Sequence, residues 1–248
     1  MITAGHSGRA DRARWGLDDP NPDVQAAALG ALARLGTLTV SDLDRALTTG
    51  PVAVRRRATD AALSVRGRGS RSTLYTLLRG SLDDPDPLVV VGAAWFLAER
   101  RVAGAVAALA TTARAHHDVR CREAAVAALG AIGDPDGLPA VIDALDDKPT
   151  VRRRATVALA GFDDPRVEPA LRRAAQDRDW QVRQAADELT EGDDRDDAGS
   201  TDAVSSVGAP DPDPAPAPDP DRDPDANPDA NPDPGAVAVA AETVSRRR

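Results

Sequence analysis

This sequence of 248 residues contains one cysteine, Cys121, and three histidines. A single cysteine excludes an intramolecular disulfide framework, and three histidines leave few ligands for a metal site. No positively charged segment followed by an apolar one opens the chain, and the apolar run at 236–241 is far shorter than the roughly 20 residues that span a bilayer. We therefore expect a protein of the reducing cytoplasm with no membrane anchor.

Aromatic side chains and lysine are also scarce. The chain holds three tryptophans, two phenylalanines and one tyrosine, and Lys148 is its only lysine, so its basic side chains are almost all arginine. Few aromatic rings weigh against a large conjugated ligand, which is normally held by extensive aromatic area. The lack of aromatic residues interleaved with basic ones also weighs against nucleic acid as a partner.

Acidic residues are concentrated toward the C-terminus. Residues 191–248 hold 15 acidic side chains against 5 arginines, a net charge of −10, whereas residues 1–190 hold 25 acidic and 26 basic side chains. The acidic segment is rich in Asp, Pro, Ala and Ser, and a composition with so little to bury is typical of disorder. We predict a folded repeat domain at 1–190 and a disordered acidic low-complexity tail at 191–248.

A short phrase recurs through the first part of the chain: an apolar anchor, usually followed by arginine, then alanines and a leucine. The anchors are Val24, Val54, Val89, Cys121, Val151 and Val182. They lie 30 to 35 residues apart, and such a regular period indicates stacked structural repeats. Each unit is too small to bury its apolar face alone and must bury it against its neighbours. The sequence therefore predicts an all-α fold, a solenoid of about six two-helix units.

The anchor phrases have helical periodicity. After Val151, apolar residues return four and eight positions later, at Ala155 and Leu159, which places all three on one face of a helix. Turns rich in Asp and Pro precede most anchors, since Asp caps a helix and Pro suits its first position. A second set of turns separates the repeats, which implies two helices per repeat, with the first helix of the first pair short. The predicted pairs cover 9–36, 40–67, 71–100, 103–132, 137–161 and 165–190.

These segments resemble a known family. Residues 121–145 (CREAAVAALGAIGDPDGLPAVIDAL) and 146–171 (DDKPTVRRRATVALAGFDDPRVEPAL) are similar to the short HEAT repeats of the phycocyanobilin lyase type. The resemblance covers about residues 10–190 and implies a HEAT-like fold. Repeats of this type occur in bilin lyase subunits, in deoxyhypusine hydroxylase and in adaptors without known chemistry. The resemblance therefore implies a fold and not an activity.

The known chemistry of that family has few counterparts in these residues. Deoxyhypusine hydroxylase holds two irons through repeated His-Glu pairs, and no His-Glu dipeptide occurs here. The only local cluster of possible ligands is His116, His117, Cys121 and Glu123, and Cys121 stands in an anchor position, where a free cysteine acts as a small buried hydrophobe. We predict no catalytic residue, no cofactor and no metal site.

Arginine clusters recur near the start of the second helices. Those considered as binding residues are Arg56, Arg122, Arg153 and Arg183. A row of arginines could bind phosphates, because guanidinium groups make bidentate contacts with them. Asp-rich turns lie within a few residues of most clusters, so structural pairing of Arg with Asp between adjacent repeats is the favoured alternative.

One tryptophan is placed to contact a partner. Trp95 follows the anchor Val89 by six residues, an offset that points away from the buried face, whereas Phe96 points into it. An exposed tryptophan is a frequent hot-spot residue in protein interfaces.

Together these features predict a non-catalytic, monomeric scaffold or adaptor that binds another protein on its inner helices. Trp95, Arg56, Arg122, Arg153 and Arg183 are the predicted partner-binding residues. One alternative is a HEAT-repeat enzyme or accessory factor, of the bilin lyase or deoxyhypusine hydroxylase kind, for which the ligand set is missing. The other is a nucleic-acid-binding HEAT protein, which the acidic balance and the self-paired arginines disfavour.

Overall fold

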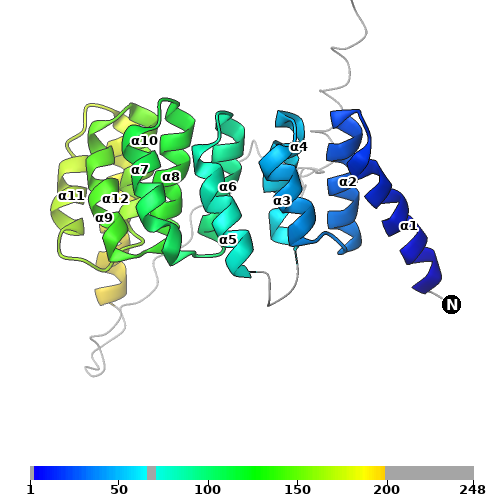
Figure 1. Cartoon of the computed structure of the whole chain (residues 1–248). Coiled ribbons are helices and arrows are strands. Elements are labelled where there is room, and N and C mark those ends of the chain that lie inside the picture. Colours follow the sequence, from blue (N-terminus) through cyan, green and yellow to red (C-terminus); the bar gives the residue numbers. More distant parts are fainter. Residues whose placement is uncertain (1–2, 66–70, 199–248) are drawn as a thin grey trace, which may run out of the picture. The chain divides into compact units, whose positions relative to one another are not determined.

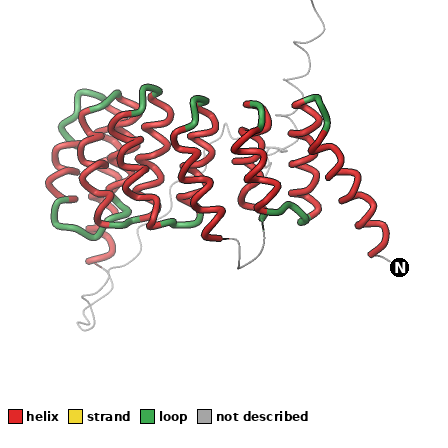
Figure 2. The backbone as a smooth tube through the Cα atoms, in the orientation of Figure 1, coloured by secondary structure: helices red, strands yellow, loops and turns green. Residues whose placement is uncertain are grey.

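The computed structural model of this chain describes the backbone of residues 3–65 and 71–198 and the side chains of residues 8–65 and 71–190. Within these residues it contains twelve α-helices joined by turns and short 3-10 segments, and no strand. The helices lie side by side, with the loops gathered at their two ends (Figures 1 and 2). They are α1 (Thr3–Trp15), α2 (Pro22–Leu35), α3 (Val40–Thr49), α4 (Val52–Ala61), α5 (Arg71–Gly80), α6 (Pro87–Glu99), α7 (Val106–Ala115), α8 (Val119–Ile132), α9 (Leu138–Asp143), α10 (Pro149–Leu159), α11 (Val167–Ala174) and α12 (Trp180–Ala198).

Consecutive helices form six pairs, from α1 with α2 to α11 with α12. The second helices, α2, α4, α6, α8, α10 and α12, pack against one another in chain order and make the most extensive contacts between pairs. First helices meet along the stack less extensively, as α3 does with α5 and α7 with α9. The predicted α-solenoid of six two-helix units is confirmed.

The Asp- and Pro-rich turns begin the second helices as expected. The side chain of Asp86 accepts hydrogen bonds from the amides of Leu88 and Val89, and Pro87 occupies the first position of α6. Asn21 and Asp118 cap α2 and α8 in the same way. These caps satisfy amide groups that have no partner inside the helix.

Four of the anchors, Val54, Cys121, Val151 and Val182, lie in one continuous apolar core that runs along the stack. These four and Val89 are at most 4% exposed. They sit where a second helix meets the preceding repeat, which is why an apolar residue returns there in every unit.

The two ends of the described stack differ from its middle. The first anchor, Val24, is 39% exposed, because the structure describes no repeat before it. At the other end, Asp187 of α12 is exposed at the position where α4, α8 and α10 bury Thr59, Val126 and Thr156. A polar outer face on the last helix is typical of a capping repeat, which keeps the end of a solenoid from packing further.

Three boundaries differ from the sequence prediction. Helix α1 has 13 residues and is not short, and α9 is the helix that is reduced, to six residues. Helix α12 continues to Ala198, eight residues beyond the predicted end of the last pair. The rest of the predicted acidic tail, 199–248, lies outside the described residues. None of the described helices is long and apolar enough to cross a membrane.

Two glycines allow second helices to approach closely. A Cβ atom on Gly130 of α8 would lie 2.6 Å from Cβ and 2.7 Å from Cα of Ala158 in α10. A Cβ atom on Gly92 of α6 would lie 2.4 Å from Oγ1 of Thr59 in α4. At Gly130 the obstruction is largely backbone, so a side chain there would push two repeats apart.

We expect Gly130→Ala to lower the free energy of unfolding by about 1–3 kcal/mol, because overpacking outweighs the gain in helix propensity. Gly80→Ala is the matched control, since a Cβ atom on this helical glycine meets nothing within 4 Å. Urea unfolding followed by circular dichroism measures both. Equal stability of the two variants would contradict the close contact between α8 and α10.

Candidate functional site

Three arginines join successive repeats through bidentate hydrogen bonds from Nε and Nη2 to an aspartate. The pairs are Arg55–Asp84 (2.7 and 3.0 Å), Arg122–Asp147 (2.6 and 2.8 Å) and Arg152–Asp177 (2.8 and 2.8 Å). Each arginine is the fourth residue after the N-cap of its second helix, and each aspartate lies one or two residues before the next such N-cap. We call these three pairs the arginine ladder. They confirm that Arg–Asp pairing between repeats is structural.

The ladder arginines also hold the turn of their own repeat. Nη1 of Arg152 donates to the carbonyl oxygen of Asp147 at 3.0 Å, and the other two arginines make the corresponding bond. The acceptor Asp177 takes a further hydrogen bond from the amide of Asp179 at 2.7 Å. One guanidinium group therefore fixes the loop in front of its own helix and the loop of the following repeat.

The ladder is shielded from solvent, most of all at its last pair. The side chain of Arg152 is 5% exposed and that of Asp177 is 14% exposed. The hydrogen bond from Arg152 holds the pKa of Asp177 below its ordinary value, and Arg122 does the same for Asp147. Buried charges of this kind are stable only when they are paired and hydrogen-bonded, so removing one partner is costly.

The same register has no Arg–Asp pair at three other places in the described chain. In α2 the position is held by Gln25, whose amide donates to the carbonyl oxygen of Asp19 at 2.7 Å. In α6 it is held by the buried Val90, and His116 takes the place of the aspartate in the next turn. Arg183 in α12 donates to carbonyl groups of its own turn, as the ladder arginines do.

Helix α6 carries an exposed face without charge. Residues 87–98 (PLVVVGAAWFLA) contain no charged side chain. The side chains of Leu88 and Trp95 are 44% and 49% exposed, and Val91 between them is half-buried. These three lie at offsets of 0, 3 and 7, on one helical face. We call them the apolar stripe. A helix that is apolar all round is normally buried, so the stripe is unusual on a surface.

The neighbouring helices extend this surface. Helix α8, packed against α6, places Ala127 at the same distance from its N-cap as Trp95. Helix α10, packed against α8, places Val157 there, and this side chain is 45% exposed. The small Ala127 of α8 therefore lies between two larger apolar side chains, Trp95 of α6 and Val157 of α10. Trp95, Ala127 and Val157 thus hold the same position on three successive second helices.

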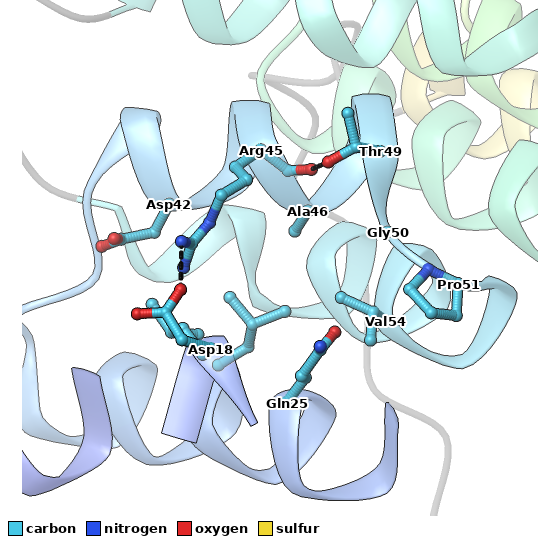
Figure 3. A pocket seen from close by; sticks show the side chains of 11 residues that line it. Asp18, Gln25, Asp42, Arg45, Ala46, Thr49, Gly50, Pro51 and Val54 are labelled. Carbon is cyan, nitrogen blue, oxygen red and sulfur yellow. Dashed lines mark hydrogen bonds and ion pairs between the residues drawn. The ribbon is translucent and has the colours of Figure 1, made fainter. Parts of the chain in front are cut away.

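Cavities in the described residues lie elsewhere. One of about 250 Å³ sits between the first two repeats, where Asp18 and Arg45 form an ion pair at 2.5 Å beside Gln25, Ala46 and Val54 (Figure 3). A cavity of about 420 Å³ occupies the equivalent place between the last two repeats. Neither is lined by the apolar stripe.

The candidate ligands His116, His117 and Cys121 lie in the turn before α8 and in its first turn. Cys121 is buried, its Sγ donates to the carbonyl oxygen of Pro87 at 3.4 Å, and burial raises the pKa of the thiol to about 11. The rings of His116 and His117 stack on each other, with centroids 4.5 Å apart. Among the side chains that the structure describes, no three of His, Cys, Asp and Glu converge to hold a metal ion.

Comparison with known families identifies the repeats. A profile for HEAT repeats matches residues 74–160 and 139–188. Residues 74–188 are HEAT repeats. The comparison with curated protein sequences found no match.

Solved structures share the HEAT-like fold of this chain at low sequence identity. A designed armadillo repeat protein in complex with the peptide (KR)4 has a TM-score of 0.56 and 19% identity, covering 73% of this chain and 97% of its own. An engineered protein has a TM-score of 0.52 and 17% identity, covering 75% and 96%. The Escherichia coli protein YibA has a TM-score of 0.52 and 17% identity, covering 74% and 72%. These likenesses show the fold.

The predicted binding arginines occupy different surroundings. Arg122 belongs to the ladder, and Arg183 occupies the equivalent position in the last repeat. Arg56 makes two bonds of 2.8 and 2.5 Å to Asp86, the N-cap of α6. Arg153 is exposed and makes no ion pair within 4.0 Å of any described acidic side chain. The four arginines therefore do not form one site.

The predicted orientation of the aromatic residues is confirmed. Trp95 is half-exposed and Phe96 is fully buried. Leu88, Val91 and Val157 were not predicted from the sequence as parts of the surface around Trp95. The sequence does indicate an apolar surface at this helix, because residues 87–98 contain no charged side chain that could cover its outer face.

Arg152→Met removes one ladder pair and keeps most of the side-chain volume. We expect it to lower the free energy of unfolding by about 2–4 kcal/mol, because the carboxylate of Asp177 is then shielded from water and has no arginine partner. The control is Arg172→Met, which removes the exposed pair of Arg172 with Glu168 and should change stability by less than about 0.5 kcal/mol. Urea unfolding compares them. Similar losses for both would show that the ladder contributes no more than a surface pair.

The ladder also predicts a pH dependence. Because the pKa of Asp177 is lower in the folded protein than in the unfolded chain, its contribution is complete above about pH 4 and is lost as the pH falls through the folded pKa. Asp177→Asn removes the carboxylate at all pH values. We expect the stability gap between wild type and this variant to narrow as urea unfolding is repeated below pH 4. A gap that stays constant would contradict the lowered pKa.

Proposed function

We propose that this protein is a non-catalytic scaffold that binds another protein on the exposed face of its second helices, centred on α6. The observation that carries the proposal is the apolar stripe of Leu88, Val91 and Trp95 on an otherwise buried, uncharged helix. Exposed apolar surface of this kind in the middle of a stack is typical of an interaction site. Residues 1–190 as repeat domain, 191–248 as tail, and the monomeric, cytoplasmic state stay predictions.

The energetics favour a protein partner at this surface. Covering the exposed parts of Leu88 and Trp95 removes apolar area from water, at about 25 cal/mol per Å². The small Ala127 next to Trp95 lets a partner side chain approach α8 closely. Tryptophan and arginine are the residues most enriched in interface hot spots, and Arg153 lies one turn from Val157 on α10. The proposed partner-binding residues are therefore Trp95 and Arg153.

The comparisons support this class of function. The designed armadillo repeat protein that shares the fold was solved with a peptide bound. The nucleic-acid alternative loses support from the ladder, because Arg55, Arg122 and Arg152 are engaged with carboxylates and loop carbonyls of the protein itself. Arg56 is likewise engaged, with Asp86.

We expect Trp95→Ala to abolish capture of the partner by the full-length protein from a nuclease-treated lysate of the source cell, with little change in the thermal melt. The reason is that Trp95 is half-exposed and its removal leaves no large internal cavity. Trp180→Ala is the matched control, since Trp180 is 62% exposed on α12, two repeats beyond α8. Captured proteins are quantified by mass spectrometry.

Two results would contradict the proposal. If Trp95→Ala and Trp180→Ala capture the same proteins as wild type, the apolar stripe is not the interaction site. If Trp95→Ala lowers the melting temperature by more than about 2–4 °C, roughly 1 kcal/mol for a domain of 150 to 250 residues, the residue stabilises the fold and its exposure has another cause.

A further inference from the structure

We infer that the partner segment is acidic at both ends and carries large apolar side chains in its middle. The inference rests on the proposed function and adds to it the chemistry of what is bound. It follows from how the charged residues around the apolar stripe are oriented.

Most ion pairs beside the stripe turn their guanidinium group outward. In the pair of Arg56 with Asp86, the arginine is 44% exposed and the aspartate 14%. In the pair of Arg120 with Asp118, the values are 59% and 16%. The aspartates face inward because each caps the N-terminus of a second helix. Solvent and any partner therefore meet the positive member of each pair.

The α10 side of the surface repeats this arrangement. Arg154 is 46% exposed and pairs with Glu123 of α8, which is 31% exposed, at 3.3 Å. Arg153 beside it is exposed and has no acidic partner within 4.0 Å among the described side chains. Its guanidinium group is free to bind a carboxylate with two hydrogen bonds. The outward charge at this edge is positive.

On the α4 side, Arg56 and Arg57 are both exposed, and Asp60, 4.0 Å from Arg57, is 66% exposed. The surface therefore has arginines at both edges, on α4 and α10. Between them lie the apolar side chains of α6 and Ala127 of α8, together with Arg120 and Glu123 of α8. A partner that matches it places carboxylates over the edges and apolar side chains over the centre. Complementary charge of this kind sets orientation and excludes basic partners.

The distance across the surface sets the length of the segment. Three helix-to-helix steps of about 9 Å separate α4 from α10, roughly 27 Å in all. An extended chain covers that distance with about eight or nine residues at 3.3 Å each. The outer residues of such a segment reach the arginines while the middle three lie over the apolar stripe and Ala127.

Three fluorescein-labelled nonapeptides test the inference against the full-length protein by fluorescence anisotropy. The first has three glutamates at each end and three leucines in the centre, the second replaces the leucines with alanine, and the third replaces the glutamates with lysine. We expect the first to bind with a dissociation constant below about 100 µM, weakening as NaCl is raised, and the other two to bind at least about tenfold more weakly.

Variants locate the binding site. Trp95→Ala and Arg153→Glu should each weaken the first peptide at least about fivefold, because one removes apolar contact and the other reverses charge. The matched controls Trp180→Ala and Arg172→Glu change an exposed tryptophan of α12 and an exposed arginine of α11, outside the surface of α4 to α10, and should leave binding unchanged.

The outcomes separate this inference from the proposed function. Equal or tighter binding of the lysine peptide, lost in Trp95→Ala, overturns the acidic preference and leaves a protein-binding surface in place. No saturable binding of the first peptide up to 1 mM also overturns the inference, while Trp95-dependent capture from lysate would still stand. Binding of a single-stranded oligonucleotide that depends on Arg153 and displaces the first peptide would overturn both.

Discussion

This solenoid depends most on one contact, the pair that an arginine of α4, α8 or α10 forms with an aspartate of the next repeat. A HEAT unit has no closed core of its own, so its loops must be fixed by its neighbours as firmly as its helices are. The guanidinium group suits this purpose, because its planar fork can bind a carboxylate with two hydrogen bonds while a further N–H reaches a carbonyl oxygen. Arg152 makes all three bonds to two separate turns. Lysine offers no such fork, and the chain contains only one lysine.

The centre of the stack depends on apolar packing. Val90 of α6 is buried where a ladder arginine would stand, and α6 and α8 pack as closely as any two second helices. Residues 87–98 carry no charge, so α6 is held mainly by hydrophobic contact on its inner faces, together with the hydrogen bond from Cys121 Sγ to the carbonyl oxygen of Pro87. The outer face keeps the same character, which leaves Leu88 and Trp95 at the surface. The apolar stripe thus lies where the ladder is interrupted.

Much of the fold could be read from the sequence. The anchor spacing and the Asp- and Pro-rich turns predicted six helix pairs, and burial of Val54 or Cys121 follows from their recurring position. The direction of each arginine could not be read in the same way, because in Arg55-Arg56-Arg57 three consecutive residues point to three sides of one helix. The fourth position after the N-cap reaches the next turn in all three ladder pairs, and the fifth does so at Arg56, which binds Asp86. Both contacts depend on how two repeats are offset in space. The exposure of Trp95 could be predicted from its offset of six residues from Val89 within one helix. That Val157 of α10 lies on the same side of the stack as Trp95 of α6 depends on how the repeats are offset in space, and it was not predicted.

The ladder has a consequence for how such a chain can lengthen. Repeat five carries both halves of the contact: Asp147 receives Arg122 from the unit before, and Arg152 reaches Asp177 in the unit after. In a tandem copy of that repeat, Arg152 of the first copy would therefore face Asp147 of the second copy and restore the Arg–Asp pair at the new junction. A copy of the third unit would set Val90 opposite Asp84, and a copy of the fourth would set Arg122 opposite His116, so neither junction would restore the pair. Tandem duplication thus preserves the contact at the fifth unit and loses it at the centre of the solenoid, where the proposed binding surface lies.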